Sequence, residues 1–301
     1  MYYEQARNFI YRNARPLDIA RWKYLFENGS KEDVLISLTA YQNEDGGFGN
    51  ALEPDCWNPN SSPVQTWVAT KIIKEINLED KNHPIIQGIL KYLSSGKDFD
   101  GHTWSNTLAT NNDYPHAPWW NFETSQEISY NPTACFIGFI LKFADKNSKL
   151  FELACSLVKE AYNYFKIHFP MDSMHTVSCF IELYEYIKKS SMNDLLDIEE
   201  FNTLLHQQIK HVITYDTSKW AVDYVCKPSL FIGTKTSDFY MNNKEISDYE
   251  CEFILNTQEP DGTWAITWSW IDYPEQWNIS KNWWKSDLII RNVRYIKEIR
   301  G

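Results

Sequence analysis

Apolar residues recur along most of the chain at intervals of three and four, the spacing of an amphipathic helix. Residues 63–76 follow this pattern, and Pro63 suits the first turn of such a helix. Residues 133–143 are apolar on nearly all sides, which predicts a helix buried all round. The other predicted helices cover roughly 16–27, 31–42, 84–93, 150–165, 175–188, 194–212, 245–256 and 284–299. Alternating patterns typical of strands are scarce, so the sequence predicts an all-α chain.

A short motif recurs between these helices. Q-x-x-D-G-x-[FW] occupies residues 42–48 and, at identical offsets, residues 258–264. Looser copies end at Trp104 and Trp220, and a degenerate copy is predicted near 162–165. These aromatic residues indicate a unit of about 50 residues, which predicts an array of helical hairpins that bury their faces against one another. The glycine should adopt a positive φ that ends the preceding helix, and the aromatic residue should fill the gap between hairpins.

The motif at these helix ends resembles the Gln-Trp repeat of terpenoid cyclases and protein prenyltransferases. The resemblance implies one α/α-toroid domain over residues 1–301, an incomplete or irregular (α/α)6-type barrel of helical hairpins. It extends to the N-P-T-A helix start at 131–134. ALEPD at 51–55, PHAPWW at 115–120 and the C-terminal NWWKSDLIIRNVRYIKEI resemble a bacterial group of prenyltransferase-like repeat proteins.

The catalytic signatures of that family are missing from this sequence. Cyclases that protonate a polyene use D-x-D-D, cyclases that ionise a diphosphate hold magnesium on D-D-x-x-D, and protein prenyltransferases bind zinc partly through D-x-C. None of the three occurs here. The resemblance therefore implies a fold without assigning a reaction, a metal or a cofactor.

The charge distribution limits the partners that we expect. A formal net charge of −11 argues against binding to nucleic acid or to an anionic membrane surface, because both require Lys and Arg. Residues 43–70, 98–141 and 257–280 contain no Lys or Arg at all. A diphosphate needs basic side chains or a metal, so these segments favour a neutral or cationic small-molecule ligand. Nothing in the sequence indicates an oligomeric state.

Cysteine usage and the N-terminal residues predict a cytoplasmic protein. The six cysteines include no C-x-x-C pair, which favours reduced thiols over disulfides or a zinc site. MYYEQARNFI lacks the basic and apolar regions of a signal peptide. No apolar run approaches the ~20 residues that a transmembrane helix needs.

Long loops are expected to carry the functional site. If outer and inner helices alternate around a toroid, the loops 43–62, 95–130, 213–228 and 257–280 lie at one rim. Long loops held by a rigid scaffold are common locations for binding sites. This rim is therefore the predicted functional face.

Three residues in these loops are candidate catalytic groups. Glu53 and Asp55 could act as an acid and a base whose pKa values are separated by their proximity. His116 could assist in proton transfer. The alternatives are structural: Asp55 and Asn58 could hold the loop, and His116 could bind backbone.

Aromatic residues are candidates for ligand binding, because an aromatic face buries a large area and tolerates a polar edge. Packing between hairpins is the alternative role. The candidates are Trp57, Tyr114, Trp119, Trp120, Trp268 and Trp270, with Trp277 nearby. Asp172, His175 and Cys179 would share a helix face and could bind a metal, but without a second ligand cluster we expect a capping Asp, a hydrogen-bonded His and a core Cys.

These observations favour an enzyme related in fold to terpenoid cyclases and prenyltransferases, which binds a neutral ligand in an acidic, aromatic central cavity and uses acid–base chemistry. Two other interpretations stay open. A glycoside hydrolase or lyase on an α/α toroid would also use paired carboxylates and Trp platforms. A non-catalytic ligand-binding module is favoured if the side chains of Glu53 and Asp55 only form hydrogen bonds to the backbone.

Overall fold

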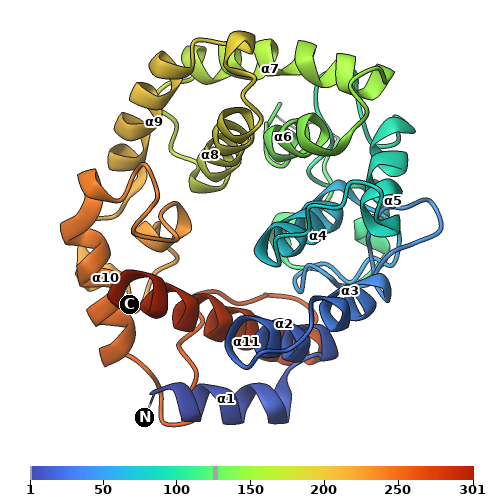
Figure 1. The fold of residues 1–301 in the computed structure, drawn as a ribbon. Coiled ribbons are helices and arrows are strands. Elements are labelled where there is room, and N and C mark those ends of the chain that lie inside the picture. The colour runs from blue at the N-terminus through green and yellow to red at the C-terminus, as the bar shows by residue number, and fades with distance from the viewer. Residues whose placement is uncertain (1, 125–127) are drawn as a thin grey trace. The chain divides into compact units, whose positions relative to one another are not determined.

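The computed structural model describes residues 2–124 and 128–301, which contain eleven α-helices and no β-strand (Figure 1). The prediction of an all-α chain is confirmed. The helices are α1 Tyr2–Asn13, α2 Pro16–Phe26, α3 Lys31–Thr39, α4 Pro63–Glu75, α5 Pro84–Ser94, α6 Thr133–Phe143, α7 Lys149–Ile167, α8 Met174–Lys189, α9 Ile198–Val212, α10 Lys244–Asn256 and α11 Pro274–Arg300.

Helix starts follow local sequence rules. Ser30, Ser62, Ser148 and Ser173 are N-cap residues, and each side chain accepts a hydrogen bond from the backbone N–H three residues later. Two boundaries differ clearly from the prediction: α1 was not predicted, and α11 begins at Pro274, ten residues before the predicted start. The first ten residues of α11 are mostly polar and exposed, so they carry a weak periodic signal.

The chain forms two compact units, which are described separately. One unit consists of residues up to Ala40 together with Ile213–Gly301, and contains α1–α3, α10 and α11. The other consists of Tyr41–Val212 and contains α4–α9. We call them the discontinuous unit and the continuous unit.

In the continuous unit the helices form two layers. Figure 1 shows α4, α6 and α8 in one layer and α5, α7 and α9 in the other, so successive helices alternate between layers. Helix α6 packs against both α7 and α8, and also contacts α4 and α5. All residues of α6 except Lys142 are buried, as its apolar sequence predicts. In the discontinuous unit α11 packs against α1, α2 and α10, and α2 packs against α3.

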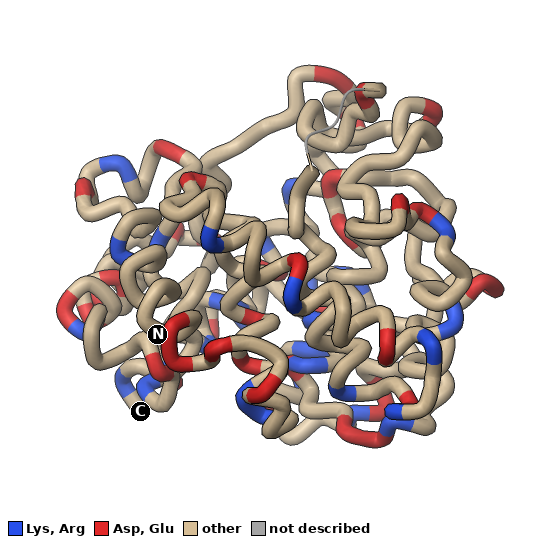
Figure 2. Tube along the Cα trace, turned by 90° about the horizontal axis from the view of Figure 1, so that it is seen from above, with Lys and Arg blue, Asp and Glu red and all other residues tan. Residues whose placement is uncertain are grey.

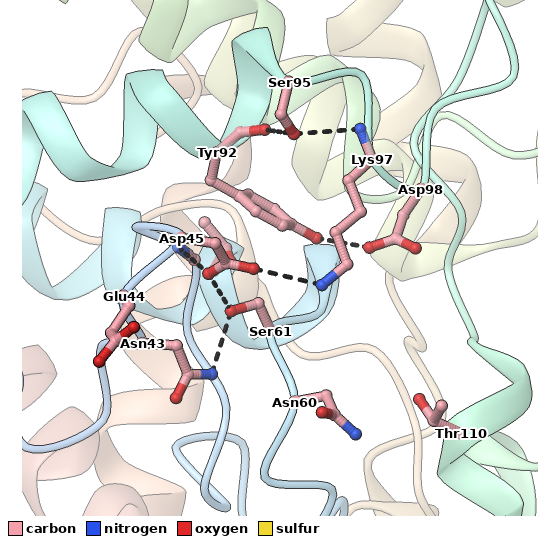
Figure 3. A network of polar contacts seen from close by, with 12 residues as sticks. Asn43, Glu44, Asp45, Asn60, Ser61, Tyr92, Ser95, Lys97, Asp98 and Thr110 are labelled. Atoms are coloured by element: carbon pink, nitrogen blue, oxygen red, sulfur yellow. Dashed lines mark hydrogen bonds and ion pairs between the residues drawn. The ribbon is translucent and has the colours of Figure 1, made fainter.

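The turn at residues 42–48 is held by its own side chains. Gln42 Nε2 donates to Gly46 O (2.9 Å), and Gly46 adopts φ +91°. Asp45 Oδ1 accepts hydrogen bonds from Gly47 N (3.0 Å) and from Ser61 Oγ (2.5 Å). Figure 3 shows this network, in which Lys97 Nζ also contacts Asp45 Oδ2 at 3.2 Å. The aromatic Phe48 is fully buried, as predicted.

The turn at residues 258–264 repeats this geometry in the discontinuous unit. Gln258 Nε2 donates to Gly262 O (3.0 Å), and Gly262 again has φ +91°. Asp261 Oδ1 accepts from Thr263 N (3.0 Å), and Lys285 Nζ lies 3.3 Å from Asp261 Oδ2. The identical offsets in the sequence therefore encode one structural motif twice.

Both turns dock on a neighbouring helix in the same way. Gln42 Nε2 also approaches Ile85 O at 3.4 Å, and Gln258 Nε2 donates to Tyr2 O at 2.9 Å. A Cβ on Gly46 would lie 2.1 Å from Gly88 O, and one on Gly262 would lie 2.3 Å from the carbonyl oxygen of residue 5. The first turn contacts residues 85 and 88 of its neighbouring helix, and the second contacts residues 2 and 5. In both helices the contacted residues are three positions apart, about one helical turn. The motif is thus a helix-docking device that requires glycine.

The looser copies keep only part of this geometry. Asp100 Oδ1 accepts from Thr103 N at 2.7 Å, Asp216 Oδ1 accepts from Ser218 N at 3.3 Å, and both following tryptophans are buried. The degenerate copy predicted near 162–165 is not a turn, because these residues lie inside α7.

Two chain-wide properties bear on the environment of the protein. All six cysteines are free thiols, so within the described ranges no disulfide supports the fold. No helix in residues 2–124 or 128–301 combines the length and the apolar character needed to span a membrane.

Candidate functional site

The loops 43–62 and 95–130 pair with each other in the continuous unit; residues 125–127 of the second loop lie outside the described residues. Trp57 N donates to Pro115 O (2.9 Å), and Ala117 N donates to Asp55 O (2.8 Å). Between these bonds, residues 56 and 116 form an isolated antiparallel bridge. Segments some sixty residues apart in the sequence therefore meet beside the acidic pair.

Two asparagines fasten these loops together. Asn58 Nδ2 donates to Asn111 Oδ1 at 2.9 Å and to Thr110 Oγ1 at 2.8 Å. Asn111 Nδ2 donates in turn to Trp120 O at 3.0 Å. Both asparagines are buried. The structural role considered for Asn58 in the sequence is present, whereas Asn111 was not singled out there.

Gln65 attaches the same region to α4. This fully buried residue accepts a hydrogen bond from Leu52 N (2.9 Å) and donates one to Asn58 O (2.9 Å). Sequence reasoning also missed Gln65. The available signal is its position on the apolar face of residues 63–76, where an amide side chain must find buried partners.

Glu53 is the most unusual group of the site. Its side chain is buried, with 6% of its surface exposed, and its Oε2 accepts hydrogen bonds from Asp55 N (2.9 Å) and Trp120 Nε1 (3.0 Å). Its Oε1 has no hydrogen-bond partner among the residues that the structure describes. Burial, and then the nearby charge of Asp55, raise the pKa of Glu53 well above its ordinary value; its hydrogen bonds and Lys71 oppose this shift.

Asp55 and His116 belong to the same pair of loops as Glu53. Asp55 is 2% exposed, and its carbonyl holds Ala117 in place. His116 is also buried, and its Nδ1 lies 2.6 Å from Tyr114 O. Because a carbonyl oxygen only accepts hydrogen bonds, Nδ1 carries the proton, and in the neutral ring Nε2 is the acceptor atom. All three predicted catalytic residues therefore lie, buried, in the same pair of loops.

The predicted aromatic residues separate into two groups. Trp57, Tyr114 and Trp120 are half-buried in the paired loops, and Trp119 is 45% exposed there. Trp268 and Trp270 belong to the discontinuous unit.

In the discontinuous unit the two tryptophans have packing partners. The Trp268 ring lies edge-on to Tyr224 at 5.2 Å and to Trp284 at 5.3 Å between ring centroids. Trp270 is buried and packs on Trp277 at 5.7 Å. The packing role considered for Trp270 and Trp277 is thus present, and only four of the six candidates lie in the unit that contains Glu53.

The candidate metal ligands diverge in the structure. Asp172 is exposed and pairs with His211 at 2.8 Å, while Cys179 is buried with its Sγ 3.5 Å from Asn131 Oδ1. Across the described ranges, no group of three or more His, Cys, Asp or Glu side chains is arranged to hold a metal ion.

The paired loops contain a candidate proton donor, Glu53, and two candidate proton acceptors, Asp55 and His116, and all three side chains are buried. A carboxyl group with a raised pKa keeps its proton to a higher pH than an ordinary glutamate, and in that form it can donate a hydrogen bond or the proton itself. Figure 2 marks Lys and Arg in blue and Asp and Glu in red along the chain; residues 43–62 and 98–130 contain acidic residues but no Lys or Arg. The arrangement suits an uncharged ligand with an oxygen or nitrogen acceptor.

Comparison of the sequence with protein-family models finds no match, and neither does its comparison with curated proteins or with solved structures.

Proposed function

We propose that Glu53, Asp55 and His116 form an acid–base site for a neutral small molecule, with Trp120 positioning the acid. Glu53 is the proton donor, Asp55 the acceptor, and His116 assists through Nε2. The observation that carries the proposal is the asymmetric Glu53 carboxyl: two donors occupy Oε2, while Oε1 has no partner in the described part of the chain.

This asymmetry supports the role of Glu53 as an acid. The two donors fix Oε2 as the acceptor oxygen, so the proton of the neutral carboxyl resides on Oε1. That O–H is then the atom available to a ligand. The raised pKa of Glu53 favours its protonated form, and a neutral acid avoids the cost of burying an unpaired charge.

We also propose that the helical hairpins close into an α/α toroid similar to that of terpenoid cyclases and protein prenyltransferases. The support is the repeated turn: two copies, in different units, cap and dock on a neighbouring helix with the same atoms. A cytoplasmic location belongs to the same proposal and is supported by the six free thiols.

A thermal-shift screen tests the site, using simple glycosides on one side and prenyl alcohols on the other. At least one ligand is expected to raise the melting temperature of the wild type and not that of Glu53→Ala, through binding-linked stabilisation. Glu44→Gln, an exposed glutamate of the same loop, is the matched control and should respond as the wild type does. Equal shifts in wild type and Glu53→Ala, or no shift with any ligand, would overturn the proposal.

The identity of the stabilising ligand then distinguishes the interpretations. Glycosides would support a carbohydrate-active enzyme, and prenyl alcohols would support isoprenoid chemistry. Incubation of the ligand with wild type and Glu53→Gln, followed by mass spectrometry of the products, separates catalysis from binding. A proton donor predicts that Glu53→Gln still binds but no longer converts the ligand.

A further inference from the structure

A second buried carboxyl lies in the discontinuous unit, on α10. Glu250 is 2% exposed and accepts two hydrogen bonds from one residue, Ser229: from its N at 2.7 Å and from its Oγ at 2.5 Å. Ser229 lies in the short 3-10 helix η5 (Pro228–Leu230) and is only half-buried. The hydroxyl of a half-buried serine is thus hydrogen-bonded to a buried carboxylate.

We propose that Ser229 is a nucleophile and Glu250 its general base, in a site that accepts small acyl esters. A hydroxyl is activated as a nucleophile when a base lies within hydrogen-bonding distance of it and a further contact holds that base in position. Here the further contact is Ser229 N, which occupies Glu250 Oε2 and directs Oε1 at Oγ. The inference is independent of the acid–base site proposed above, which lies in the other unit.

The surroundings of Glu250 suit a base that works near neutral pH. Burial raises the pKa of Glu250 to about 7, against the opposing effect of its hydrogen bonds and of Lys227. Burial also lowers the pKa of Lys227. Among the described residues, the ionisable groups that interact with the carboxyl are Cys226 and Lys227 before η5, Cys251 on α10 and Tyr295 on α11; Asp248 acts on Tyr295 and Cys251, and Arg291 acts on Lys227.

The step balances without any further reactant. Ser229 Oγ attacks the ester carbonyl, its proton passes to Glu250 Oε1, and the carbon–alkoxide bond breaks. The proton then passes to the departing alkoxide, which leaves as an alcohol and regenerates the carboxylate. Water, with Glu250 again as base, releases the acid from the acyl-serine.

A fluorophosphonate probe tests the nucleophile directly, because the Oγ–P bond forms as fluoride leaves and the adduct is stable to mass spectrometry. We expect the label on the wild-type peptide that contains Ser229, and no label at that position in Ser229→Ala. Ser237→Ala is the matched control: Ser237 is half-buried, accepts from Phe239 N at 3.3 Å and should leave the labelling of Ser229 unchanged.

Glu250→Gln tests the base, since glutamine keeps the shape and one acceptor oxygen but takes no proton. Labelling should slow by about 100-fold. In the wild type the rate should rise with pH through about 7 and level off above it. An unlabelled Ser229, or an unchanged rate in folded Glu250→Gln, overturns the proposal. If Glu250→Gln does not fold, a wild-type rate that is flat across this pH range overturns it instead.

Discussion

Trp120 Nε1 donates a hydrogen bond to Glu53 Oε2 at 3.0 Å, which joins two residues 67 positions apart in the sequence. The bond connects the loop before α4 to the loop before α6. It also decides which oxygen of the buried carboxyl is left for a ligand. The relationship therefore links the pairing of the loops to the chemistry proposed for them.

Trp120→Phe removes this donor while it keeps an aromatic ring. We expect a loss of about 1 kcal/mol in the free energy of unfolding, the net value of one hydrogen bond. The pKa of Glu53 should rise further, because the bond opposes the effect of burial. Chemical denaturation measures the first effect, and the pH dependence of ligand binding measures the second.

Trp119→Phe is the control, because Trp119 is 45% exposed and adjacent in sequence. It should change the free energy of unfolding by less than about 0.5 kcal/mol. Equal losses in the free energy of unfolding in the two variants would show that the hydrogen bond of Trp120 does not stabilise the fold.

Glu53→Gln should flatten the pH dependence of stability. Below the ordinary pKa of 4.5 the carboxyl is protonated in both folded and unfolded chains; above it the unfolded chain loses the proton first. Stability therefore falls as pH rises from 4.5 to the raised folded-state pKa, by up to ~1.4 kcal/mol per pH unit from this group. Denaturation of wild type and variant between these pH values measures the difference.

The exposed Glu44 supplies the comparison for that experiment. Glu44→Gln should keep the wild-type slope. A wild-type slope in Glu53→Gln as well would mean that Glu53 titrates alike in folded and unfolded chains, which contradicts the raised pKa.

Gly46→Ala and Gly262→Ala should both be strongly destabilising. At each position φ is +91°, and a Cβ would lie within 2.3 Å of a backbone carbonyl oxygen of the adjacent helix. The backbone strain alone is worth about 1–3 kcal/mol, and the clash adds to it. Urea denaturation of the two variants should give losses of similar size.

Gly101→Ala separates the two causes. Gly101 has φ +103°, but its added Cβ would meet no atom of the described chain within 4 Å. Its loss should reflect strain only and should be the smallest of the three. A loss at Gly101 as large as at Gly46 would refute the docking role of the motif glycine.

Gln65→Leu should weaken the candidate site through its scaffold. It leaves Leu52 N and Asn58 O without their buried partner, at a cost of about 1–3 kcal/mol for each group. Gln87→Leu, at an exposed glutamine on α5, should cost far less. Thermal unfolding compares the two; similar losses would exclude Gln65 as an anchor of the loop.

Helix positions could be predicted from the sequence wherever a buried face imposes periodicity. The predicted helix at 133–143 coincides with α6, in which all but one residue is buried. The start of α11 was missed because its first turns bury only Trp277 and Ser280. The turns at 42–48 and 258–264 were predictable because glycine at positive φ and a local Asp cap are encoded within seven residues.

The partners within the site could not be predicted in the same way. Glu53 was identified from its neighbour Asp55, but its bond to Trp120 depends on how two long loops fold against each other. Asn111 gives no periodic signal, because its partner Asn58 lies 53 positions away; the position of Gln65 on an apolar face indicates a buried amide, but not its partner Leu52 N, 13 positions away. Local rules act over one or two turns, and these contacts do not.

The docking of Gln258 on Tyr2 O has a consequence for biosynthesis. The first forty residues belong to a unit whose remaining part starts at Ile213, so they leave the ribosome long before α11, which packs against α1 and α2, exists. Residues 41–212 form a compact unit of their own, which is complete once Val212 has been added. During translation, residues 41–212 should therefore fold first. The contact between α1 and the turn at residues 258–264 can form only after that turn has been synthesised.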